Sequence, residues 1–143
     1  MAVRVWGVVG DRLIEVCVEP SAGAGIQIEG LPESRTRTAR DRVRATLFNS
    51  ALVREDPYVV IRLEPAVRAG ATSALDLALA LGVLGGVGVI APGVRWILAT
   101  GRLGLDGMVH ADGLAEWLSL SDVVESLCQT RDVDSERMFE RPS

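Results

Sequence analysis

The sequence predicts an α+β domain, or a split βαβ arrangement, with strands in its first and later thirds and two helices between them. Two observations lead to this prediction. The stretch from Ser73 to Leu84 is so rich in Ala and Leu that a helix there has no polar face and must be buried. The N-terminal third holds two β-branched runs separated by a Gly-Asp turn, which is typical of a hairpin. A chain of 143 residues suits one domain that buries roughly two thirds of its unfolded surface.

Three strands are expected before the first helix. Residues 3–9 and 13–18 form the arms of the hairpin around Gly10-Asp-Arg12, and residues 26–28 form a short third strand. In the second arm the apolar residues alternate with the others, so one face of the hairpin is expected to be buried. The two alternating sets are Ile14, Val16 and Val18 on one face, and Leu13, Glu15 and Cys17 on the other.

A helix is expected from Glu33 to Ser50, after the break at Gly30-Leu-Pro. Ala39, Val43 and Leu47 recur every four residues and form an apolar stripe, which we place against the sheet or the central helix.

The same helix carries the densest basic patch of the chain. Three of its arginines share a second face, and the other two point elsewhere. The patch is either a solvated face, partly neutralised by Glu33 and Asp41, or a grip for phosphate or for an acidic partner surface. The facing set is Arg37, Arg40 and Arg44, and the remaining two are Arg35 and Arg42.

The central helix is expected over residues 73–84, after a strand at 57–63. Ser73 and Asp76 form a capping box at its start, and the glycines at 82, 85 and 86 weaken its end. Asp76 is expected to accept N–H groups of the loop or to pair with Arg68.

In the C-terminal third, the pattern predicts a strand over residues 96–101. Residues 102–105 either continue this strand or begin a partner strand. Asp106 and Gly107 form a hairpin turn with residues 108–110 returning. A helical turn at 113–118 and a short helix at 120–129 follow, and the last dozen charged residues are expected to be mobile.

Composition excludes several kinds of chemistry. All fifteen basic residues are Arg, so a P-loop, a Ser-Lys dyad and a Schiff-base lysine are absent from these residues. Two cysteines are too few for a disulfide framework, and neither a secretion signal nor a membrane span is recognisable, so the expected compartment is the cytoplasm. The net charge of −4 gives no general attraction to nucleic acid.

Three motifs in the expected order resemble the N-terminal, magnesium-chelatase-like domain of the ComM/YifB proteins. They are Gly30-Leu-Pro with Glu33-Ser-Arg, Arg42-Val-Arg-Ala45 and Asn49-Ser50; Leu63-Glu-Pro-Ala66 with Leu75-Asp-Leu-Ala-Leu-Ala-Leu-Gly82; and Gly101-Arg-Leu-Gly-Leu-Asp-Gly107. The resemblance implies a Lon-protease-like mixed sheet with two packed helices over residues 1–118, followed by a short helix and flexible tail over 119–143. It also implies a domain that normally precedes an AAA+ ATPase module and packs around a ring. These 143 residues lack that module, so a stand-alone member, a remnant or a fragment is expected.

The catalytic serine and lysine of the Lon protease domain are absent from the positions of this sequence that resemble theirs. The position resembling the nucleophile falls at Ala74, next to Ser73, and the position resembling the catalytic lysine falls at Glu116. His110 is the one histidine, and a triad built on it is disfavoured because it lies on a hairpin strand. Two cysteines and one histidine do not make a metal site, and no cofactor is expected. Trp6, Trp96 and Trp117 are expected as core or interface anchors.

Three functions are consistent with these features. The first is a non-catalytic scaffold that self-associates or docks on a partner, such as a separately encoded AAA+ ATPase, through an apolar patch with an Arg rim. The second is a DNA-binding accessory domain for recombination or transformation that uses the Arg-rich helix. The third is a cryptic hydrolase that uses Ser73.

Overall fold

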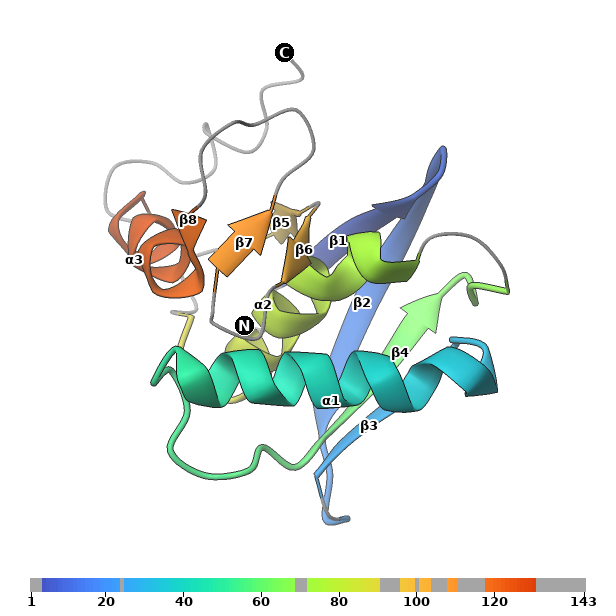
Figure 1. Ribbon diagram of the computed structural model, residues 1–143, viewed down its shortest axis with the longest axis horizontal. Coiled ribbons are helices and arrows are strands. Elements are labelled where there is room, and N and C mark those ends of the chain that lie inside the picture. Colours follow the sequence, from blue (N-terminus) through green and yellow to red (C-terminus); the bar gives the residue numbers. More distant parts are fainter. Residues whose placement is uncertain are drawn as a thin grey trace.

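The computed structural model describes residues 4–23, 25–68, 72–90, 96–99, 101–103, 108–110 and 118–130 (Figure 1). Strands dominate the first and later thirds of these residues, and two helices lie between them, as predicted. The elements in order are β1 (Arg4–Val9), β2 (Arg12–Pro20), β3 (Ile26–Glu29), α1 (Glu33–Asn49), β4 (Val59–Glu64), a 3₁₀ helix η1 (Thr72–Leu75), α2 (Asp76–Gly86), β5 (Trp96–Leu98), β6 (Arg102–Leu103), β7 (Met108–His110), β8 (Leu118–Ser119) and α3 (Leu120–Thr130).

The larger sheet is mixed and has the strand order β3-β4-β2-β1-β5. β2 is antiparallel to β1 and β4, whereas β5 is parallel to β1 and β3 is parallel to β4. The predicted hairpin is confirmed: Val9 pairs with Arg12, and Gly10 occupies the turn with a φ of 63°, which a glycine adopts without strain.

One face of this sheet forms the floor of the core. Ile14 and Val16 are buried while Leu13 is 52% exposed, as the alternation in β2 predicts. α2 packs on β1, β2 and β4, and α1 lies over α2 and β3 on the same side (Figure 1). On the other face of these strands, every described side chain is exposed or half-buried.

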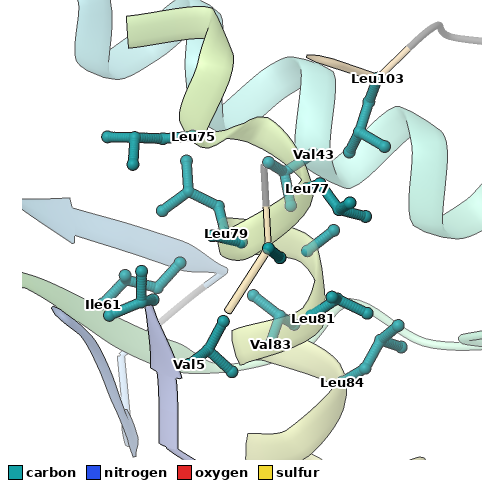
Figure 2. Packing of buried hydrophobic residues seen from close by; sticks show 14 of the residues in the cluster. Val5, Val43, Ile61, Leu75, Leu77, Leu79, Leu81, Val83, Leu84 and Leu103 are labelled. Carbon is teal, nitrogen blue, oxygen red and sulfur yellow. The ribbon is translucent and has the colours of Figure 1, made fainter. Parts of the chain in front are cut away.

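α2 is the buried centre of the domain, as predicted. Every residue from Asp76 to Leu84 is buried, and Figure 2 shows its leucines between the strands and Val43 of α1. The predicted start is wrong, because residues 72–75 form the 3₁₀ helix and Leu75, without a side-chain hydrogen bond, is the N-cap. The proposed Ser73–Asp76 capping box is therefore not at the start of α2.

The end of α2 also differs from the prediction, because the helix continues to Gly86. A Cβ atom on Gly82 would lie 2.9 Å from Cγ1 of Val16, and one on Gly86 would lie 2.7 Å from Cγ1 of Val18. These glycines let the helix approach β2 closely, and that packing outweighs their low helix propensity.

α1 matches its prediction closely. Its stripe of Ala39, Val43 and Leu47 is at most 4% exposed and faces the core.

A small antiparallel sheet with the order β6-β7-β8 sits beside the start of α2. β6 pairs with β7 as the predicted hairpin requires, although Asp106 and Gly107 at its turn lie outside the described residues. Arg102 therefore begins a partner strand and does not extend β5. Most of the predicted helical turn at 113–118 lies outside the described residues, and Leu118 belongs to a strand.

α3 confirms the predicted C-terminal helix. Its N-cap is Ser119, whose Oγ accepts the N–H of Asp122 at 3.0 Å. Ser121 Oγ donates to the Ser50 carbonyl at 3.2 Å, which places α3 beside the C-terminal end of α1. In the described part of the chain, no helix has both the length and the apolar character needed to cross a membrane.

Candidate functional site

A buried ion pair joins three elements at the start of α2. The Asp76 carboxylate on α2 is 1% exposed, and its Oδ2 lies 2.7 Å from Nε of Arg42 on α1, whose side chain is 27% exposed. Arg42 Nη2 donates to Oδ1 at 3.1 Å, and the Leu103 N–H on β6 donates to Oδ2 at 3.3 Å. Within the described residues the Nε–H of Arg42, unlike its Nη2–H, makes no hydrogen bond. The contact between Nε and Oδ2 of Asp76 is therefore chiefly ionic.

Burial is the largest influence on this carboxylate. It raises the pKa of Asp76, and the charge and hydrogen bond of Arg42, the Leu103 N–H and the charge of Arg102 oppose the rise only in part. Loss of water around the carboxylate thus outweighs the attraction of its cation.

The partner of Asp76 differs from the one expected. The sequence suggested Arg68, which is exposed, whereas the cation is Arg42, a member of the predicted contact patch. Arg42 flanks the apolar stripe of α1 and reaches the start of α2 because the two helices pack together. A lone carboxylate on an all-apolar helix needs a buried partner, and Arg42 beside the core stripe of α1 was the residue that this requirement could have identified.

The other arginines of α1 lie on its outer side but are not equally available. Arg44 donates from Nε and Nη2 to the two carboxylate oxygens of Asp56, at 2.6 and 3.1 Å, and stacks 5.4 Å from the centre of the Phe48 ring. Arg40 lies 3.6 Å from Asp41, and Arg35 and Arg37 are exposed. The structure therefore pairs Arg40, Arg42 and Arg44 with carboxylates and leaves a smaller basic surface than the sequence suggested.

The residues weighed for hydrolysis are only partly described. Ser73 lies in η1, and His110 ends β7, which pairs with β6. Ala74 is half-buried, whereas Asp106, Gly107 and Glu116 lie outside the described residues. Within the described residues no three His, Cys, Asp or Glu side chains are grouped as metal ligands.

The open side of the large sheet forms a second candidate surface, which we name the open sheet face. One row of it crosses four strands, because Glu64 pairs with Glu15, Glu15 with Trp6, and Trp6 with Leu98. The face consists of Arg4, Trp6, Val8, Leu13, Glu15, Cys17, Glu19, Gln27, Glu29, Val60, Arg62, Glu64 and Leu98.

Its apolar part is a corner made by Trp6, Val8, Leu13 and Leu98. Val8 pairs with Leu13 next to the row that holds Trp6 and Leu98. Leu13 is 52% and Leu98 54% exposed, and they are two of the four large apolar side chains most exposed among the described residues. Trp6 is half-buried, in keeping with an interface anchor, while the side chains of Trp96 and Trp117 lie outside the described residues.

The rest of the face is acidic, which differs from the expected Arg rim. Arg4 donates to Glu15 at 2.8 Å and lies 5.5 Å from the centre of the Trp6 ring, and Arg62 lies 3.4 Å from Glu29 and 3.8 Å from Glu19. Four glutamates and two arginines give the face a formal charge of −2.

Cys17 lies on the same face, and its pKa is affected by the neighbouring glutamates. Partial burial raises the pKa of the Cys17 thiol, and the negative charges of Glu15 and Glu64 raise it further, against Arg4. A thiol in this environment is a poor nucleophile near neutral pH.

An apolar groove of about 530 Å³ lies elsewhere, between the loop after α1 and the end of α2. Its lining includes Tyr58, 55% exposed, and Val87, 42% exposed, while Arg54 and Glu55 on its rim offset each other in charge.

Comparison with known proteins identifies the family. Residues 14–121 match the family model described as subunit ChlI of Mg-chelatase. None of the curated proteins matches the chain. Because the matched range spans α1, α2 and most of the strands described above, the chain belongs to the ChlI family.

Proposed function

We propose that this protein is a non-catalytic docking domain that binds a protein partner through the open sheet face. The observation that carries the proposal is the apolar corner, where two leucines more than half exposed flank a half-buried tryptophan. Clustered exposed apolar side chains of this kind mark interaction surfaces.

Two further points support a role by contact. The family is named for a subunit, which is a component of a larger assembly. The buried Asp76 carboxylate already holds Arg42 and the Leu103 N–H, so it serves packing between α1, α2 and β6. An AAA+ ATPase is the partner class that the resemblance to ComM/YifB proteins favours.

Gel filtration with light scattering of the full chain, alone and mixed with the AAA+ ATPase encoded nearest to it, tests this function. We expect a complex that Leu13→Ser with Leu98→Ser abolishes. The matched control is Tyr58→Ser with Val87→Ser, which removes the two other large apolar side chains that are exposed among the described residues. A wild-type chain that forms no complex, or two variants with the same effect, would contradict the proposal.

DNA binding by α1 is a second candidate, supported by the exposed Arg35 and Arg37 beside the half-buried Arg40. Its test is fluorescence anisotropy with labelled single-stranded and branched DNA over a range of salt concentrations. Phosphate contacts predict that Arg37→Ala with Arg40→Ala weakens binding and flattens the salt dependence. Binding that these changes leave intact would remove α1 as the DNA contact.

A further inference from the structure

The open sheet face divides into an apolar end and an acidic end along a single row of side chains. Leu98 and Trp6 stand at the β5 side of the row, and Glu15 and Glu64 stand at the β4 side. Neighbouring strands are about 4.8 Å apart, so the row spans about 14 Å from the first to the last strand. A partner that lies along this row meets apolar side chains first and carboxylates afterwards.

The carboxylates differ in how well they are neutralised. Glu15 accepts two hydrogen bonds from Arg4, at 3.0 and 2.8 Å. Glu64 has no cation within 4 Å among the described residues, and it stands directly opposite Glu15 in the β2–β4 ladder. Like charges placed opposite each other on a sheet repel. A cation of the partner would therefore reduce the repulsion between the Glu15 and Glu64 carboxylates.

A second copy of this chain does not fit that requirement. Two open sheet faces would bring together two surfaces that each carry a formal charge of −2. The outer side of α1 offers arginines, but the apolar stripe of that helix is buried in the core and cannot cover the apolar corner. Neither of these surfaces of the described residues matches the face, so we take the occupant to be a different protein.

We propose that the open sheet face binds a segment of another protein in which apolar residues are followed, about 14 Å further along the same side, by Arg or Lys. In a helix this distance corresponds to about 9 to 11 residues, and residues about 11 apart lie on the same side. The apolar residues cover Leu98, Leu13 and Trp6, and the basic residues meet Glu64 and Glu15. This inference rests on the proposed docking function, and it adds the partner's chemistry.

Two labelled helical peptides of about 18 residues test the charge preference. Both peptides carry Leu at one end of one side. About 11 residues further along that same side, one peptide carries Arg and the other carries Glu. Fluorescence anisotropy with the full chain should give about tenfold tighter binding of the Arg peptide in low salt. Glu64→Gln, which removes a repulsion and should not harm folding, should shrink this preference several-fold. Leu98→Ser should weaken both peptides, and Arg37→Ala on α1 should change neither.

Cys17 gives an independent readout, because it lies on the face beside the acidic end. In a Cys128→Ser background, the Arg peptide should protect Cys17 from iodoacetamide. Two results would overturn the proposed preference for a basic partner: equal binding of the two peptides, and a preference that Glu64→Gln leaves intact. Either result does so even where Leu98→Ser shows that the peptides bind to the open sheet face. If neither peptide binds, the proposed partner chemistry is overturned as well. The gel-filtration comparison tests the docking function separately. Self-association through this face would overturn it as well.

Discussion

Replacing Asp76 tests how the buried ion pair contributes to stability. Asp76→Ala removes the acceptor of the Arg42 Nη2–H and of the Leu103 N–H. A hydrogen bond to a charged group is worth about 1.5–3 kcal/mol, and an unsatisfied buried N–H costs about 1–3 kcal/mol. Because Arg42 is 27% exposed and can regain water, we take the low end of both ranges and expect a loss of about 3 kcal/mol.

Asp76→Asn separates the role of the charge from that of the acceptor. Asn keeps an oxygen that accepts the Leu103 N–H. The pKa of Asp76 is raised because burial destabilises the charged carboxylate by more than Arg42 stabilises it. We therefore expect Asp76→Asn to lose about 1 kcal/mol or less.

Urea unfolding followed by far-UV circular dichroism measures both variants. With an m-value of about 2 kcal/mol/M, Asp76→Ala should lower the midpoint by about 1.5 M. Asp56→Ala, which breaks the exposed pair with Arg44, is the control and should leave the midpoint unchanged. Equal losses for Asp76→Asn and Asp76→Ala would refute the reasoning, because they would mean that the attraction between the charges dominates.

Four further predictions follow from the same structure. The stability of the wild type relative to Asp76→Asn should be greatest below the unfolded Asp pKa of about 3.9 and should fall as the pH rises through the raised folded pKa; a difference that grows with pH in urea titrations would contradict this. Arg42→Met should cost about 2–3 kcal/mol at pH 7 and less in acid, where Asp76 can protonate, and a pH-independent loss would argue against the pair. Gly82→Ala should destabilise by about 1 kcal/mol, since crowding against β2 of about 2 kcal/mol exceeds the gain in helix propensity of about 1 kcal/mol; a higher melting temperature would show that β2 yields. In Cys128→Ser protein, Cys17 should react with iodoacetamide at a higher pH than an unfolded cysteine does, and Glu64→Gln should shift that profile toward lower pH; an unchanged profile would remove the acidic field as its cause.

Local patterns were sufficient for most of the elements. The alternation in β2, the four-residue stripe of α1 and the apolar character of α2 each depend on neighbours along the chain, and each is confirmed. The turn at Gly10 belongs to the same class, because a two-residue hairpin needs a positive φ that glycine adopts readily.

The errors occurred where distant elements meet. Gly82 and Gly86 suggested an early end to α2, but their missing side chains let the helix pack on Val16 and Val18. Residues 96–105 read as one strand or two, and only the hydrogen bonding of β5 with β1 and of β6 with β7 divided them between two sheets.

The candidate surfaces depended on tertiary structure even more. The spacing of the five arginines of α1 does not show which of them meets a buried carboxylate. The fold separates Arg42, beside Asp76, from Arg37, which is exposed to solvent. The row from Leu98 to Glu64 joins four strands and could not be inferred before their order was known.

By itself, the sequence determined that a buried apolar helix lies at the centre of an α+β domain and that no lysine chemistry operates within these residues. These properties follow from residue type and spacing, which act over a few neighbouring residues. Only the tertiary structure decided which cation meets Asp76 and which side chains share the open sheet face. Ion pairs and surfaces form between residues far apart in the chain, and their distances are set by packing.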